Sequence, residues 1–150
     1  MKVLAILIIT FGLSTGISRM ITGSWNLVFS GNLALFLMLC VTAIGHYKFA
    51  PGMAMMMPGF IPFRKEIVFW SGILEILLGL GLLFPSTRSM AGVSLVILLV
   101  LILPANINAA ARHIDFEKAT YSGPGPAYLW FRIPMQVFLI AWVYWFALRR

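Results

Sequence analysis

Long apolar runs fill most of the chain, and short polar segments separate them. Runs of roughly 17–22 residues have the length that a helix needs to cross the hydrocarbon core of a bilayer. The pattern predicts five transmembrane helices, at residues 3–22, 33–49, 67–84, 90–110 and 127–148. We therefore expect an all-α fold: an integral membrane helical bundle that forms one transmembrane domain over residues 1–150.

The start of the chain is similar to a signal peptide, because Lys2 precedes a short apolar core. The apolar character continues past Leu13, however, and no clear cleavage site of small residues precedes a polar segment. Residues 3–22 are therefore interpreted as a transmembrane helix. The segment "GSWNLVFSGN", residues 23–32, is interpreted as the link to the next helix, and an earlier start of that helix, before residue 33, is left open.

The composition indicates which solvent surrounds much of the protein surface. Hydrophobic residues make up 61% of the chain and charged residues 10%, whereas soluble domains are about a quarter charged. Lipid must therefore be the solvent for much of the surface. The net charge is +7, and the lysines and arginines lie at the edges of the apolar runs. This placement is typical of side chains that anchor a helix to lipid headgroups rather than of nucleic-acid binding. Cys40 is the single cysteine, which excludes a thiol–disulfide relay within the chain.

The segment "GHYKFAPGMAMMMPGFIPF", residues 45–63, concentrates four methionines between two prolines. Their thioethers could bind copper(I), with a histidine nearby. On a helix, however, consecutive methionines point in different directions, and methionine is also a good filler of irregular apolar surfaces. We therefore interpret residues 51–58 as a short interfacial helix across the mouth of the bundle, and we expect no metal site.

Several polar residues occur at depths where lipid penalises them. Glu75 and Gln136 lie roughly halfway along their predicted helices, near the membrane midplane. Arg132 precedes Gln136 by four residues, so the two side chains share a helix face. Asn106 follows Pro104, which is expected to free a backbone carbonyl and to kink the helix. A glutamate near a histidine would also suit proton transfer at neutral pH.

The order of the helices brings these polar residues into one group. The second and fourth predicted helices end on the side of the membrane where the third and fifth begin. The candidate ligand-binding residues are His46, Lys48, Glu75, Asn106, Asn108, Arg132 and Gln136. They form either a polar pocket open toward one leaflet or a buried network that fills the same space. A network that only holds helices together would contribute roughly 0.6–2 kcal/mol per contact.

A series of short motifs resembles the DoxX-like family of small bacterial membrane proteins. The motifs follow the order G-H-Y, M-M-P-G-F-I-P-F, G-x-x-E-I, P-A-N-I and R-x-P-x-Q, between Asn32 and Trp145. The resemblance implies a compact four-helix core in the bacterial plasma membrane, to which the N-terminal helix is an addition. The residues at positions that match the family's pattern are His46, Glu75, Asn106, Arg132 and Gln136.

The resemblance also implies several functional settings. The family's name comes from a subunit associated with a quinone-linked thiosulfate-oxidising complex, and other members are tied to oxidative-stress assemblies. The vertebrate chaperone for assembly of nicotinic acetylcholine receptors is similar in the same region. Paired cysteines that serve redox work in some distant relatives are absent from this sequence.

Three classes of function remain after these arguments. The first is a binding protein whose polar pocket holds the head of an amphiphilic molecule, a quinone or a lipid, as an accessory redox-linked or stress-linked membrane component. The alternative is a membrane-protein assembly or chaperone factor that acts through helix–helix contacts, with a purely structural polar network. An enzyme is the least supported class, because the sequence offers no metal, flavin or thiol redox centre. The expected partners are the lipid bilayer and other membrane proteins, with self-association left open.

Overall fold

The computed structural model describes residues 2–149, and every regular element in that range is a helix. The elements are α1 (Lys2–Thr22), α2 (Leu27–Lys48), α3 (Ala50–Met56), α4 (Arg64–Gly81), α5 (Arg88–Ala111), α6 (Ala127–Val143) and a π-helical continuation, η1 (Tyr144–Leu148). An isolated bridge between Asp115 and Thr120 shapes the loop between α5 and α6. The expected all-α fold is confirmed.

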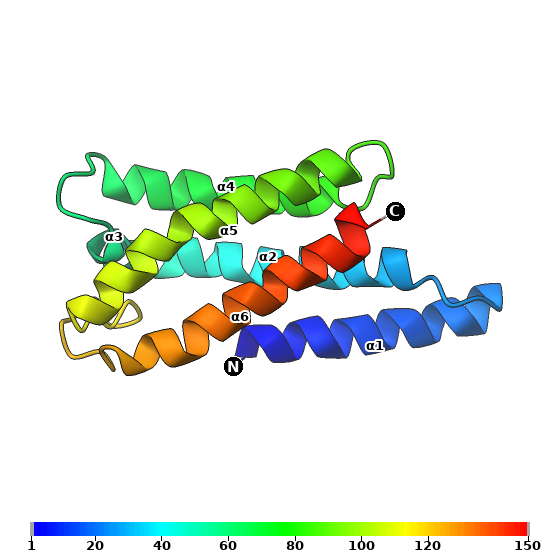
Figure 1. The fold of residues 1–150 in the computed structure, drawn as a ribbon, viewed down its shortest axis with the longest axis horizontal. Coiled ribbons are helices and arrows are strands. Elements are labelled where there is room, and N and C mark those ends of the chain that lie inside the picture. Colours follow the sequence, from blue (N-terminus) through cyan, green and yellow to red (C-terminus); the bar gives the residue numbers. More distant parts are fainter. Residues whose placement is uncertain (1, 150) are drawn as a thin grey trace.

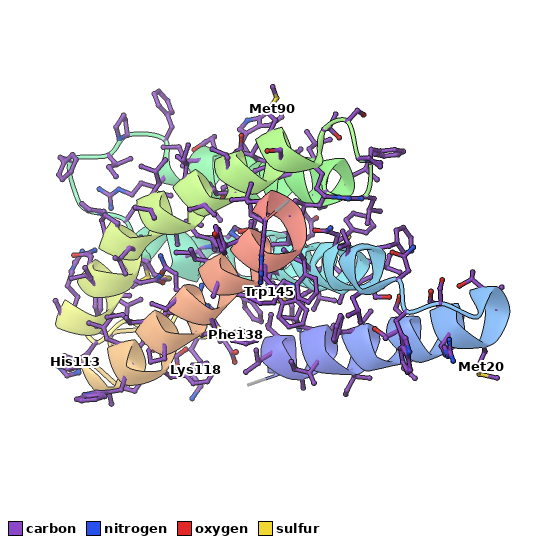
Figure 2. The ribbon with its side chains drawn as sticks, turned by 45° about the vertical axis from the view of Figure 1, so that its right-hand side comes forward. Met20, Met90, His113, Lys118, Phe138 and Trp145 are labelled. Carbon is purple, nitrogen blue, oxygen red and sulfur yellow. The ribbon has the colours of Figure 1, made fainter. Side chains whose placement is uncertain are left out.

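The long helices form a bundle in which α2 is the central element (Figure 1). Helix α2 packs against α1 on one side and α4 on the other, and α5 and α6 cross in front of them. Helix α1 extends past the end of the bundle, and Met20 marks its projecting end in Figure 2. Short helix α3 closes the opposite end, where it contacts α4 and α5.

Four helices are long and apolar enough to cross a membrane: α1, α2, α5, and α6 together with η1. This result is compatible with a membrane helical bundle and agrees with four of the five predicted spans. The remaining one, predicted at residues 67–84, corresponds to α4. Helix α4 carries Arg64, Lys65, Glu66 and Glu75 within 18 residues, so it has more charged residues than the four apolar helices that could cross a membrane.

The core of the bundle lies where the long helices meet. Fully or almost fully buried side chains come from α1, α2, α5 and α6 and from the residue that follows α4: Leu7, Leu35, Met38, Leu95, Val143 and Leu82. Burying one such side chain contributes about 1.5–3 kcal/mol in water. Between helices in lipid the contribution comes mainly from close packing.

The link is shorter than residues 23–32, because α2 has the earlier of the two starts considered and begins at Leu27. Asn32 forms a hydrogen bond to a residue far away in the sequence, which the surrounding residues do not predict. Its Nδ2 donates to the carbonyl oxygens of Val28 and Phe146, each at 2.9 Å. The Ser14 hydroxyl likewise donates to the Ser30 hydroxyl across 3.1 Å. Polar residues inside this stretch therefore join helices instead of ending one.

Trp142 packs against residues of other helices in the bundle. Its indole Nε1 donates to the carbonyl oxygen of Gly31 at 3.0 Å, and its ring packs against Phe11 and Phe146. Gly31 permits the close approach of the Phe146 ring, because a Cβ atom at that position would not fit against it. Trp145, labelled in Figure 2, is exposed, and the Arg149 guanidinium stacks over its ring.

Candidate functional site

A glycine on α4 determines how closely the histidine of α2 can approach Glu75. Gly72 lies three residues before Glu75 on the same face of α4, and both are buried. A Cβ atom at Gly72 would lie only 2.9 Å from the Cβ of His46. Because glycine has no side chain, His46 can lean over α4, and its Nε2 lies 3.7 Å from Glu75 Oε1. Within residues 2–149, this pair is the one contact at ion-pair distance.

The hydrogen bonds of His46 fix its orientation. Its Nδ1 lies 3.0 Å from the Thr42 carbonyl oxygen, one turn earlier on α2. A carbonyl oxygen can only accept, so Nδ1 carries a proton and Nε2 is the nitrogen that faces the Glu75 carboxyl. The imidazole and the carboxyl can therefore share one further proton between them.

The Thr42 hydroxyl supports the same carboxyl group. Its Oγ1 lies 2.9 Å from Glu75 Oε2 and 2.8 Å from the carbonyl oxygen of Leu39. A hydroxyl has one proton to donate, so these two acceptors compete for it. A proton on the Glu75 carboxyl would allow Thr42 to serve both neighbours. The arrangement thus accommodates either a charged or a neutral glutamate.

A second polar group joins α5 to α6 on the same side of the bundle. The Tyr128 hydroxyl donates to Asn106 Oδ1 across 3.2 Å. Asn106 is 1% exposed, and its Nδ2 has no hydrogen-bond partner. A buried amide donor without a partner costs about 1–3 kcal/mol. This donor is therefore a place where an acceptor oxygen of a bound molecule or a water would stabilise the protein.

Arg132 connects the two polar groups electrostatically. It lies one turn after Tyr128 on α6, and its side chain is half-buried. The guanidinium is within electrostatic range of both the Glu75 carboxyl and the Tyr128 phenol. We call the set Thr42, His46, Glu75, Asn106, Tyr128 and Arg132 the polar cluster. Its members come from α2, α4, α5 and α6.

Three predicted site residues find partners elsewhere. Gln136 is buried, and its Nε2 donates to the Leu99 carbonyl oxygen at 2.7 Å, near the turn that Pro104 disrupts. Asn108 Nδ2 donates to the Met56 carbonyl oxygen at 2.7 Å. Lys48 is exposed, with its ammonium over the Phe49 ring. The structure thus pairs His46 with Glu75 and places Arg132 within electrostatic range of that carboxyl. Asn106 is linked to this group through Tyr128 and Arg132, whereas Gln136 and Asn108 donate to backbone carbonyls of neighbouring helices.

The methionine-rich segment forms the expected short helix, α3, next to this end of the bundle. Met56 is buried with Ala109 and Ile114, and Tyr128 packs against the same cluster. Gly52 lies so close to the Phe116 carbonyl that a Cβ atom would not fit between them. The hydrogen bond from Asn108 to Met56 also ties the C-terminal end of α3 to α5. Helix α3 is therefore a packed cover over α5 and Tyr128.

Two shallow, open grooves lie on the surface of the described residues, and neither is lined by a member of the polar cluster. One, of about 370 Å³, lies between α4 and α5 and is lined mainly by apolar side chains such as Leu77 and Phe84. The other, of about 310 Å³, lies between α3 and the start of α4.

Sequence reasoning missed two members of the polar cluster, although a signal existed for both. Thr42 precedes His46 by four residues, and Tyr128 precedes Arg132 by four residues. Side chains at this spacing share a helix face. Extending the faces of His46 and Arg132 by one turn would have found both hydroxyl groups.

One family comparison covers the whole polar cluster. The family described as "Domain of unknown function (DUF8561)" matches residues 35–147. The chain belongs to the DUF8561 family. The DUF8561 match begins within α2 and ends within η1, so α1 lies outside it. No curated protein and no solved structure matches the chain. The resemblance to DoxX-like proteins stays a prediction.

Proposed function

We propose that this DUF8561 protein is a multi-pass membrane protein that binds the polar head of an amphiphilic molecule, a quinone or a lipid, at the polar cluster. In this proposal α4 is the fifth membrane-spanning helix, with Glu75 turned toward α2 instead of lipid. The other four long helices complete the bundle, as a four-helix core with α1 added at its side.

The observation that carries the proposal is the buried combination of an acid–imidazole pair with an unpartnered amide donor. Ionisable groups inside a membrane bundle are costly and commonly mark a functional site. Glu75 and His46 can exchange a proton with a ligand oxygen, because His46 Nε2 faces the carboxyl at 3.7 Å. Asn106 Nδ2 offers a hydrogen bond to a second oxygen, and Arg132 adds positive charge nearby. A quinone carbonyl or a lipid ester fits these donors.

An assembly or chaperone role is the second candidate, and the projecting end of α1 favours it. Met20, at the projecting end of α1 in Figure 2, is 87% exposed, and the adjacent Ile21 is 78% exposed. Apolar side chains at that level would gain from contact with another membrane protein. In this alternative the polar cluster only fixes the bundle, and removing its charge would leave the set of bound lipids unchanged.

A retention experiment separates the two candidates. The full chain, purified in mild detergent, would be extracted with organic solvent, and bound quinones and lipids would be quantified by mass spectrometry. We expect Glu75→Gln and His46→Ala to lower retention of one amphiphile about ten-fold, the size of a lost hydrogen bond to a charged group. Glu117→Gln makes the same chemical change in the exposed loop and should leave retention unchanged. Equal retention in all four proteins would reject binding at the polar cluster.

A further inference from the structure

The groove between α3 and α4 combines apolar walls with charges of both signs. Pro51, Ala54 and Met55 line it from α3, and Arg64, Lys65 and Glu66 line it from the first turn of α4. The volume is about 310 Å³. No member of the polar cluster belongs to this groove, so it is a separate feature of the same end of the bundle.

The arginine of this groove is held in place by the preceding loop. Arg64 Nε donates to the Ile61 carbonyl oxygen at 3.0 Å, and its Nη2 donates to the Gly59 carbonyl oxygen at 2.6 Å. The backbone of Phe63 is left-handed, with φ of 51°, where the loop turns into α4. These contacts orient the guanidinium but leave Nη1 without a described partner. An arginine that is fixed in this way loses little side-chain entropy when it binds an anion.

The charges of the groove do not neutralise one another. Lys65 and Glu66 are exposed, and no ion pair forms among Arg64, Lys65 and Glu66 within the described residues. A ligand that carries a negative and a positive group would complement both. A purely anionic ligand would pair with Arg64 and Lys65 but would also meet the Glu66 carboxylate.

The surroundings of the groove match the level of lipid headgroups. Phe60 and Phe63 are 85% and 75% exposed, and they flank the loop that leads into α4. Exposed aromatic side chains next to lysine and arginine are typical of the membrane–water interface. The apolar wall formed by α3 then offers a surface for the glycerol backbone and the upper part of an acyl chain.

From these observations we infer that the groove binds a phospholipid whose headgroup carries a phosphate and a primary ammonium group, as in phosphatidylethanolamine. The phosphate pairs with Arg64 and Lys65, and the ammonium group donates to the Glu66 carboxylate. A choline headgroup cannot donate hydrogen bonds to that carboxylate, and a glycerol headgroup carries no positive charge. The inference is independent of ligand binding at the polar cluster.

A lipid titration of the full-length, delipidated protein tests this inference. Phosphatidylethanolamine, phosphatidylcholine and phosphatidylglycerol with identical acyl chains would be added separately, and adducts would be counted by native mass spectrometry. We expect the wild-type protein to bind phosphatidylethanolamine about two- to five-fold more tightly than either other lipid, as partly exposed ion pairs would give. Equal affinities, or tightest binding of phosphatidylglycerol, would overturn the inference without any variant.

Two substitutions test which side chain of the groove recognises which charge of the headgroup. Glu66→Gln should remove the preference for phosphatidylethanolamine over phosphatidylglycerol, and Lys65→Gln should weaken binding of all three lipids. Glu117→Gln and Lys118→Gln are matched controls on exposed residues of the loop between α5 and α6, and Lys118 is visible in Figure 2. Glu75→Gln should leave the lipid ranking intact, which distinguishes this groove from the polar cluster. A preference that survives Glu66→Gln would contradict the assignment.

Discussion

Replacing Gly72 with leucine is expected to abolish ligand retention and to lower the thermal stability of the protein. A Cβ atom at Gly72 would already lie 2.9 Å from His46 Cβ and 3.2 Å from His46 Cγ. A leucine side chain therefore pushes His46 away from Glu75 and separates α2 from α4. Overpacking of this kind costs about 1–3 kcal/mol. The measurements are the melting temperature in detergent and the quantity of amphiphile that remains after purification.

Gly12→Leu is the matched control for this substitution. Gly12 also lies in a long apolar helix, but no atom comes within 4 Å of a Cβ placed there. The same change should therefore leave both the melting temperature and the retained amphiphile close to wild type. Wild-type behaviour of Gly72→Leu would show that the close approach of His46 to α4 is not needed.

Asn32→Leu is expected to produce the second large effect, a loss of stability with no direct effect on the polar cluster. The Asn32 amide donates to the Phe146 carbonyl oxygen, which lies in η1, and to the Val28 carbonyl oxygen. Leucine leaves the Phe146 carbonyl without this donor in an apolar environment. The expected cost is about 1–3 kcal/mol, measured as a lower melting temperature.

Two further variants show whether the effect belongs to the Asn32 hydrogen bonds. Val41→Leu on the same helix lies at an exposed position, so it should leave the melting temperature unchanged. Trp142→Phe removes the neighbouring bond to the Gly31 carbonyl and should destabilise the same contact between α2 and α6. If Asn32→Leu melted at the wild-type temperature, the contact between α2 and η1 would not depend on this amide.

The long apolar runs predicted the helices well, because lipid-facing and core-facing positions are both apolar in such a bundle. The start of α2 was the boundary that the sequence left least defined. Ser30 and Asn32 have the character of loop residues, yet both are buried within the helix. Their partners, Ser14 and the Phe146 carbonyl, belong to other helices. A single stretch of sequence cannot show such partners.

The polar cluster was predictable in part, for a geometric reason. Alternating helix directions were enough to bring His46 and Glu75 together, and the structure places them 3.7 Å apart. The side chains of Gln136 and Asn108 instead donate hydrogen bonds to backbone carbonyls of other helices, and these bonds determine where the side chains lie. The Leu99 carbonyl lies near the disturbance that Pro104 causes, and the Met56 carbonyl depends on how α3 folds back. Neither position follows from the depth of a residue in its helix.

Nuclear magnetic resonance of the two histidines tests the central claim most directly. The chain contains two histidines, so ¹⁵N-histidine labelling reports on the polar cluster through His46 and on the exposed loop through His113. The probes are decylubiquinone and a short-chain phosphatidylcholine, each titrated into the delipidated protein. We expect one of them to shift the His46 ring signals in a saturable way while the His113 signals stay in place. If neither probe moved His46, or if both histidines shifted together, the polar cluster would not be the binding site.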